Sequence, residues 1–226
     1  MKVAVIRFPG SNCDLDTVHA IQDVLRAPCQ LVWHKEFNSG KFDAVILPGG
    51  FSYGDHLRAG IIAAFSPAMK EIKSMAAQGR PVLGICNGFQ ILVESGLLPG
   101  ALLRNSGMNF VCKWIALKVE SNRSLFTRST PAGTILKMPI AHGEGRYYVD
   151  ENELKQLYAN GQVIFKYVDE QGDATPEANP NGSLDNIAGV CNEAGNVLGL
   201  MPHPERASES ILGGVDGRAV LQALAR

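Results

Sequence analysis

The segment Gly84-Ile-Cys86-Asn-Gly88 places a cysteine between two glycines, directly after the apolar run Val82–Ile85. Such a run predicts a short strand buried on both faces, and apolar residues at helical spacing follow it. A nucleophile held on a sharp strand-to-helix turn needs glycines beside it, because larger residues do not fit there. The start of the following helix favours the thiolate, which is the attacking form of cysteine. We therefore predict that Cys86 is a nucleophile rather than a core cysteine.

A cysteine nucleophile needs a base, and the chain contains five histidines. His203 is the strongest candidate, since it follows an apolar strand and stands between two prolines that stiffen the backbone. In an extended chain Glu205 lies on the same side as His203, where a carboxylate fixes the tautomer of the imidazole. The weaker candidates are His56 and His142 in glycine-rich loops, and His19 and His34, which are expected to be packed or solvated rings.

The segment Pro48-Gly-Gly-Phe-Ser-Tyr-Gly-Asp-His56 is rich in glycine and follows another apolar run. Many such loops are only turns. If this one has a function, it is an oxyanion hole, in which two backbone N–H groups stabilise the charge that develops on an amide carbonyl. We expect these donors at Gly50 and at Asn87, the residue after the cysteine. The chain has no G-x-x-x-x-G-K-[ST] motif, so the loop is not predicted to bind phosphates.

The elements that must position these residues alternate between strands and helices. Strands are expected at residues 2–8, 30–34, 42–47 and 82–85, with a first helix that Asp14 or Asp16 caps. This order predicts an α/β fold with an open, mainly parallel sheet and helices on both faces. Because ligands bind beyond the carboxyl ends of such strands, the glycine-rich loop and Cys86 are expected on one rim.

The remaining elements follow from the same periodicities. A helix is expected from Ser66-Pro67 to Gly79, and residues 97–104 are expected to form a loop. Later elements are strands at 113–119, 134–141 and 162–168, a helix from 151, an exposed loop at 172–185, a hairpin of 187–191 with 197–201, and a last helix at 218–224. We expect residues 1–226 to form a single domain.

Composition excludes several classes of function. The 226 residues are 46% hydrophobic and 19% charged, with a formal net charge of −1, so nothing points to a nucleic acid or a membrane surface. The N-terminus has no leader pattern, and a reducing cytosol is the expected location. The five cysteines lack C-x-x-C spacing, which argues against a disulfide framework and against zinc. The four cysteines other than Cys86 are expected to be ordinary buried thiols.

Together, Gly84–Gln90, Pro202-His203-Pro-Glu205 and Pro48-Gly49-Gly50 resemble the motifs of class I (triad) glutamine amidotransferases over nearly the whole chain. Ala141–Arg146 and Met201–Arg206 resemble, more closely, the glutaminase subunits of phosphoribosylformylglycinamidine synthases. The resemblance implies a flavodoxin-like fold with one glutamine amidotransferase type 1 domain. It implies a catalytic triad and a glutamine site, with these residues: Cys86 as nucleophile, His203 as base, Glu205 as orienting carboxylate, and Gln90, His142, Gly143 and Glu144 near the glutamine.

The resemblance also implies partners. The chain is expected to hydrolyse L-glutamine and to supply ammonia to a separate ATP-dependent synthetase subunit, which converts formylglycinamide ribonucleotide to formylglycinamidine ribonucleotide in purine biosynthesis. A small third subunit is expected as well. No cofactor is expected in this chain, because ATP and magnesium serve the synthetase. One departure is His56, which stands where an aromatic residue, tyrosine above all, is expected.

Three alternatives stay open at this point. The chain could be the glutaminase of another synthase, such as one that makes guanylate or carbamoyl phosphate. It could be a stand-alone cysteine hydrolase on a similar fold, which has no need of Gln90 or of the His-Pro-Glu segment. It could also be a regulatory subunit with a silent site. The presence of Cys86, His203 and Glu205 argues against this alternative, since a silent site has no need of all three.

Overall fold

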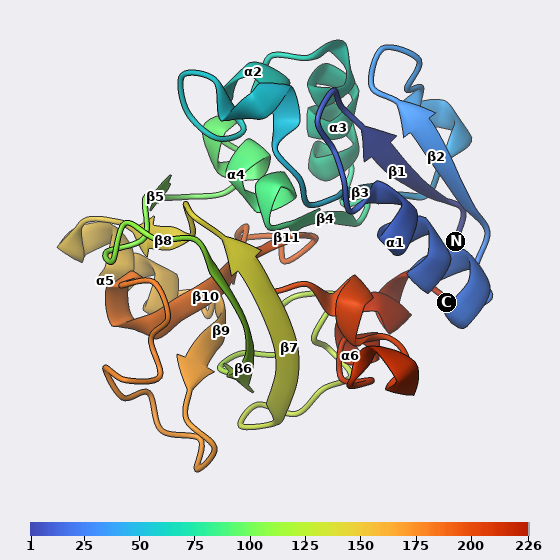
Figure 1. The fold of residues 1–226 in the computed structure, drawn as a ribbon. Coiled ribbons are helices and arrows are strands. Elements are labelled where there is room, and N and C mark those ends of the chain that lie inside the picture. Colours follow the sequence, from blue (N-terminus) through green and yellow to red (C-terminus); the bar gives the residue numbers. More distant parts are fainter. Residues whose placement is uncertain (226) are drawn as a thin grey trace.

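The computed structural model describes residues 1–225, which form a nine-stranded sheet in the order β2-β1-β3-β4-β11-β10-β9-β6-β7 (Figure 1). Five neighbouring strands are parallel, and the other four continue the sheet with antiparallel pairs. The parallel strands are β2 Cys29–Trp33, β1 Val3–Arg7, β3 Ala44–Leu47, β4 Val82–Ile85 and β11 Val197–Leu200. The antiparallel strands are β10 Ile187–Cys191, β9 Val163–Val168, β6 Val111–Val119 and β7 Ile135–His142.

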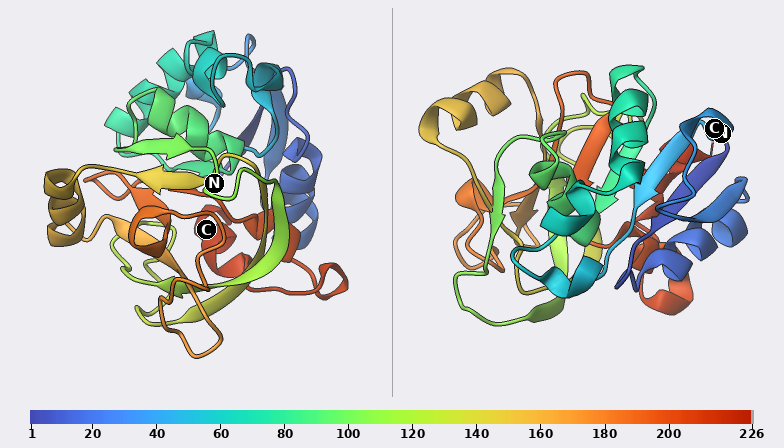
Figure 2. Two further views of the ribbon diagram at one scale, coloured as in Figure 1. Left: turned by 60° about the vertical axis from the view of Figure 1, so that its left-hand side comes forward. Right: turned by 90° about the horizontal axis from the view of Figure 1, so that it is seen from above.

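Helices cover both faces of this sheet, as the alternation of elements predicts. The views in Figures 1 and 2 show α1 on one side of strands β1 and β2, with α3 and α4 on the other. The α-helices are α1 Asp14–His19, α2 Ile61–Ala64, α3 Pro67–Ala77, α4 Asn87–Glu94, α5 Glu151–Ala159 and α6 Arg218–Leu221. Among the described residues, no helix is both long and apolar enough to span a membrane.

Short turns of helix extend or join these elements. A π-helical turn at Ala20–Val24 continues α1. The 3₁₀ turns are Ser39–Lys41, Ser52–Asp55, Leu184–Asn186, Pro204–Ala207, Ser210–Leu212 and Gln222–Leu224. The predicted last helix is therefore α6 followed by a 3₁₀ turn.

Two local predictions are wrong. Neither Asp14 nor Asp16 caps α1, because the N-cap residue is Cys13 and both aspartates lie in the first turn. Asp14 instead pairs with Arg7 at the end of β1. Residues 97–104 are not only a loop, since β5 Ala101–Leu103 pairs with β8 Arg146–Tyr148 as a separate ribbon. A three-residue strand is too short to show periodicity in the sequence.

The direction of the strands explains why distant segments meet. Strands β1, β3, β4 and β11 are parallel, so the segments that leave them start at the same edge of the sheet. Four antiparallel steps separate β11 from β7, which therefore runs in the same direction and ends at the same edge. The loops after β1, β3, β4, β7 and β11 consequently form one rim, as is usual for ligand sites in open α/β sheets.

The turn between β4 and α4 has no space for side chains at either glycine. A Cβ atom at Gly88 would lie 1.9 Å from the carbonyl oxygen of Leu47, and one at Gly84 would lie 2.7 Å from the Gly88 backbone. Between them, Cys86 has φ 50° and ψ −106°, outside the regions that ordinary residues occupy. The sharp strand-to-helix turn predicted from the glycine spacing is confirmed.

Gly88→Ala should lower the free energy of unfolding by about 3 kcal/mol or more, because the new methyl group collides with backbone rather than with a movable side chain. Gly107→Ala is the matched control, since a Cβ atom there meets nothing within 4 Å. Urea unfolding of both variants and of the wild type measures the difference. Equal unfolding midpoints for the two variants would contradict the close approach of α4 to β3.

Candidate functional site

The rim encloses a pocket of about 150 Å³ that contains most of the predicted site residues. Its walls come from the loop after β3, the turn between β4 and α4, the end of β7 with the loop that follows, and Phe110, which directly precedes β6. The lining residues are Gly50, Phe51, Asp55, Cys86, Gln90, Phe110, Ala141, His142, Gly143 and Glu144. The structure therefore brings the predicted nucleophile, one predicted oxyanion donor and the predicted glutamine-binding residues to one small cavity.

Cys86 lines this pocket and is 5% exposed. Its backbone N–H donates to the Leu200 carbonyl at 2.8 Å, and its own carbonyl accepts from the Gln90 N–H at 3.1 Å. These two bonds tie the strained residue to both β11 and α4. Its thiol lies 3.8 Å from the carbonyl oxygen of Ala141, across the pocket.

His203 and Glu205 form a buried pair behind the cysteine. The Nδ1 atom of His203 lies 2.6 Å from Oε1 of Glu205, and their side chains are 2% and 0% exposed. The adjacency was predicted, but the reason was wrong. Residues Pro204–Ala207 form a 3₁₀ turn instead of an extended segment, and this turn folds Glu205 back under the imidazole.

Two opposing effects act on the pKa of His203. Burial lowers it, but the Glu205 charge and the nearby thiols of Cys86 and Cys13 outweigh burial and hold the pKa well above its ordinary value of 6.5. A protonated imidazole next to Cys86 favours the thiolate. The arrangement thus places a positively charged imidazole between the Cys86 thiol and the Glu205 carboxylate.

Gly50 has a conformation that suits an oxyanion donor. It forms an isolated antiparallel bridge with Ser11, in which Asn12 donates to Gly49 and Phe51 donates to Gly10. The N–H of Gly50 takes no part in these bonds and so faces away from the residue 9–12 loop. Its φ of +148° requires glycine, and a Cβ atom there would lie 2.8 Å from backbone atoms of that loop.

Gln90 and Asn87 are locked together at the start of α4. The Nδ2 atom of Asn87 donates to Oε1 of Gln90 at 2.8 Å, and Nε2 of Gln90 donates to the carbonyl of Glu144 at 2.6 Å. Oδ1 of Asn87 in turn accepts from the N–H of Ser52 at 3.1 Å. This chain of bonds connects the loop after β3, the elbow and the loop after β7, so Gln90 has a positioning role in the pocket wall.

His142 lies in the same pocket but differs from His203 in charge. Burial, together with the nearby His203, lowers the pKa of His142 to about 4, so the ring is neutral. Its Nδ1 lies 3.2 Å from Oδ1 of Asn105, an oxygen that also accepts from the N–H of Gly145. Because Oδ1 can only accept, Nδ1 carries the proton and Nε2 is an acceptor. His142 is therefore a neutral wall residue.

Asp55 is a pocket residue whose individual role the sequence did not reveal, although it lies in the glycine-rich segment. Burial, together with the negative charge of Glu144, raises the pKa of its carboxyl group to about 6. Two carboxylates thus face one small pocket. Such a pair attracts a ligand cation, because a positive charge between them relieves their repulsion.

The expectation of ordinary buried thiols is wrong for Cys112, which is exposed, and Cys29 is only half buried. Cys13 and Cys191 are buried as expected, but Cys13 has neighbours that the sequence did not reveal. It is 3% exposed at the start of α1 and lies close to His203 on the side of Gly49. Nη2 of Arg206 donates to its sulfur at 3.2 Å. No spacing in the sequence could reveal this contact, since the three segments are far apart along the chain.

The other three histidines do not line the pocket. His34 is buried against Phe8, Trp33 and Tyr53, and His19 is half exposed between Asp23 and Glu209. His56 is exposed and does not line the pocket. The pattern of packed or solvated rings is confirmed for His19 and His34.

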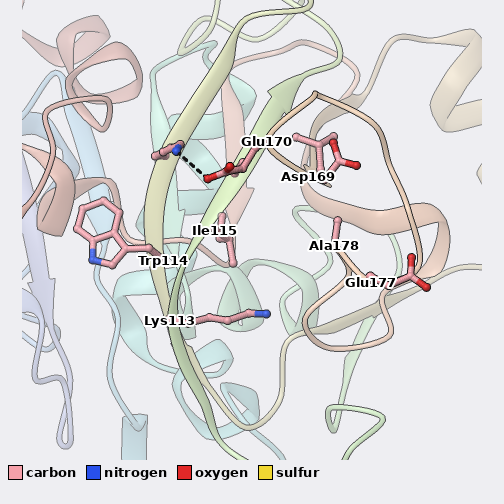
Figure 3. Close-up of a pocket in the computed structure, with 10 residues that line it drawn as sticks. Lys113, Trp114, Ile115, Asp169, Glu170, Glu177 and Ala178 are labelled. Atoms are coloured by element: carbon pink, nitrogen blue, oxygen red, sulfur yellow. Dashed lines mark hydrogen bonds and ion pairs between the residues drawn. The ribbon is translucent and has the colours of Figure 1, made fainter.

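A larger hollow of about 240 Å³ lies elsewhere, beside strands β6 and β9 (Figure 3). Lys113, Trp114 and Glu170 are among the residues that line it. The dashed line in Figure 3 marks the ion pair between Lys137 and Glu170, at 3.4 Å. It has no thiol or histidine in its lining. The smaller pocket instead has the Cys86 thiol in its lining, with the buried His203 next to that thiol, and this arrangement suits acyl transfer from a small amide.

Comparisons with known proteins agree with this chemistry. Residues 1–214 match the family model described as a CobB/CobQ-like glutamine amidotransferase domain. The protein named phosphoribosylformylglycinamidine synthase subunit PurQ from Aquifex aeolicus is 58% identical over 217 residues, covering 96% of each chain. The protein of the same name from Methanosarcina acetivorans is 56% identical over 225 residues, covering 100% of this chain and 97% of its own.

Solved structures give the same result. A chain in the structure of PurLQS from Thermotoga maritima is 44% identical, with a TM-score of 0.86 and coverage of 99% of this chain and 96% of its own. A glutamine amidotransferase from Thermotoga maritima, at 18% identity and a TM-score of 0.59, covers 99% of this chain and 90% of its own. The second match shows the fold alone.

The geometry predicts which thiol is reactive. A small alkylating reagent should modify Cys86 faster in the wild type than in His203→Asn, by at least about tenfold, because a positioned base contributes 10²–10⁴ to such steps. Mass spectrometry of the peptides measures each cysteine separately. Cys112, which is exposed, is the internal control and should react equally in both proteins. Equal Cys86 rates in the two proteins would show that His203 does not activate it.

Proposed function

Because the chain belongs to the CobB/CobQ-like glutamine amidotransferase family, we propose that it is the glutaminase subunit of a phosphoribosylformylglycinamidine synthase. The relatives that match it over almost their full length carry that name. The observation that supports the chemistry best is the buried His203 and Glu205 pair beside a cysteine on a strained turn. A silent site has no reason to keep this arrangement.

The first half of the reaction uses the imidazolium and thiolate pair. The Cys86 thiolate attacks the side-chain amide carbon of L-glutamine, and the carbonyl oxygen takes up negative charge. The N–H groups of Gly50 and Asn87 stabilise this oxyanion. His203 gives its proton to the leaving nitrogen, the C–N bond breaks, and ammonia departs from a thioester on Cys86.

The second half regenerates the enzyme. His203, now neutral, takes a proton from a water molecule that attacks the thioester carbon. The C–S bond breaks, glutamate is released, and Cys86 returns as a thiolate beside the imidazolium. Glu205 keeps Nδ1 of His203 protonated throughout, so that Nε2 carries out both proton transfers.

The polar groups of the pocket suit the α-ammonium and α-carboxylate groups of glutamine. The carboxylates of Asp55 and Glu144 provide negative charge for its α-ammonium group. Arg104, 3.4 Å from Glu144, provides positive charge at the edge, next to where the α-carboxylate would lie. Gln90 holds the wall that carries Glu144, which is a positioning role.

The synthetase subunit is the proposed recipient of the ammonia, and a small third subunit completes the enzyme. Large apolar side chains near the pocket support a partner surface there. Phe51 and Phe110 line the pocket at 44% and 53% exposure, and Leu57 nearby in the chain is 94% exposed. Exposed apolar groups gathered in this way are typical of surfaces that another protein covers.

We also propose that this chain works without a cofactor of its own and in the cytoplasm. The triad chemistry needs no additional group, and ATP with magnesium belongs to the synthetase. All five cysteines are free, which suits a reducing compartment. A single domain also remains a proposal, and the continuous sheet of nine strands supports it.

Cys86→Ala should lower glutamate release from L-glutamine, in the presence of the synthetase and small subunits, by about 10⁴-fold or more, as removing a nucleophile does in other triads. Cys112→Ala is the matched control, because this thiol is exposed and should leave activity unchanged. The isolated chain is expected to be poorly active if a partner completes the site. Activity that survives in Cys86→Ala would disprove the nucleophile, and stimulation only by a different synthase would disprove the proposed partner.

Glutamine binding should weaken as the pH falls through about 6. Below this pH Asp55 is protonated, so the pocket loses one of the two charges that attract the ammonium group, and KM for glutamine rises. In Asp55→Asn the KM should be high at every pH and lose this dependence, whereas exposed Glu177→Gln should behave as the wild type. Steady-state kinetics between pH 5 and 8, roughly the range in which buried carboxyls of this kind titrate, measure both. A KM profile unchanged in Asp55→Asn would remove Asp55 from substrate binding.

A further inference from the structure

The side chain of Asn105 is buried against the ring of His142, outside the lining of the glutamine pocket. It belongs to the segment between β5 and β6. All four hydrogen-bonding positions of its amide are used. Nδ2 donates to the carbonyls of His142 and Asn109, both at 2.9 Å, while Oδ1 accepts from the N–H of Gly145 at 3.0 Å and lies 3.2 Å from Nδ1 of His142. The amide is therefore held in one place.

The backbone partners of Asn105 decide which way round its amide lies. Two of them are carbonyls, which can only accept and so face Nδ2. The third is the N–H of Gly145, which can only donate and so faces Oδ1. The same oxygen lies against His142, so Nδ1 of that ring has to be the donor. Asn105 thus fixes the tautomer of His142.

The other ring nitrogen of His142 is a buried acceptor. Its Nε2 has no hydrogen-bond partner among the described residues, although the ring lines the same pocket as Cys86. Because Nδ1 is bound to Asn105, Nε2 is the nitrogen that is available to a ligand. A buried acceptor without a partner is costly, and a bound molecule that brings a donor removes this cost. Glutamine brings N–H donors in both its side-chain amide and its α-ammonium group.

We propose that Asn105 is a positioning residue for glutamine binding, which keeps His142 in the neutral Nδ1–H form so that Nε2 accepts a hydrogen bond from bound glutamine. This inference rests on the proposed glutaminase function, since glutamine supplies the donor. An amide suits this role better than a carboxylate, because its oxygen accepts from the ring without adding negative charge. The carboxylate of Glu205, by contrast, holds His203 positive. A positive His142 has N–H at both nitrogens and offers no acceptor to the substrate.

Asn105 also holds the loop that follows β7. Its backbone N–H donates to the carbonyl of Gly143 at 2.9 Å, in addition to the side-chain bonds to the backbone of His142 and Gly145. Gly145 lies close against the ring, since a Cβ atom there would be 2.4 Å from Cε1 of His142. Glu144 lies between these fixed residues and lines the pocket. One buried amide therefore positions both the ring and the loop that carries Glu144.

The first test is NMR of the ring nitrogens in the full chain with isotopically labelled histidine, read without glutamine and assigned with His142→Gln. At neutral pH the wild type should show an uncharged His142 with its proton on Nδ1. In Asn105→Asp, which changes the size of the side chain little, the new carboxylate should raise the pKa of His142 well above its value of about 4. A charged His142 or an Nε2–H tautomer in the wild type would overturn the proposal, as would an unchanged pKa in Asn105→Asp.

Kinetics with the synthetase and small subunits give the second test. The KM for glutamine should rise about tenfold in Asn105→Asp, as the loss of one hydrogen bond predicts, with a smaller change in kcat. Asn196→Asp is the matched control, because Asn196 is also buried and its Nδ2 donates to the carbonyls of Ala76 and Arg80, at 2.9 Å each. It should keep the wild-type KM and the wild-type pKa of His142.

Thermal unfolding shows whether both variants are folded, and the tautomer of the wild type is read without any variant. An unchanged KM in Asn105→Asp would overturn the role in glutamine binding. Because the NMR measurement needs no glutamine, failure of the proposed glutaminase function would leave that test intact.

Discussion

The left-handed backbone of Cys86 is the constraint on which the site depends. A residue with a side chain at φ 50° carries strain of about 1–3 kcal/mol, which the surrounding structure must offset. Strand β4 supplies the support, because it lies between β3 and β11 and is buried along its whole length. The close packing of Gly88 on Leu47 then leaves α4 only one position, so the thiol is fixed before any substrate binds.

The buried charge of Glu205 explains the protonation of the site. A carboxylate without solvent is costly unless a partner and hydrogen bonds compensate it, and its nearest partner is the imidazole of His203. The ring is therefore held positive next to the Cys86 thiol. His142 lines the pocket, but its Nδ1 lies against the amide oxygen of Asn105 rather than a carboxylate, and it stays neutral. The difference in charge between the two buried histidines thus follows from one neighbouring side chain.

The sequence predicted the features that depend on local spacing. The glycines around Cys86 indicated the elbow, and the apolar runs indicated where the main strands lie along the chain. The adjacency of His203 and Glu205 was predicted from an extended backbone. The segment instead forms a 3₁₀ turn, which also brings the two side chains together. Cys13 was missed because its contacts join loops that only the sheet brings together. The charge of Asp55 was missed for the same reason, since burial and Glu144 set it.

Those loops are also coupled to one another. The residue 9–12 loop binds the residue 49–53 loop through Phe51 to Gly10 at 2.9 Å and Tyr53 to Pro9 at 2.7 Å, and Cys13 binds Gly49 at 3.2 Å. The same short segment therefore sets the position of the Gly50 amide and places the Cys13 thiol against His203. Neither loop has the regular hydrogen bonding of the strands that precede it. A displacement of either loop therefore affects both the Gly50 amide and the Cys13 thiol.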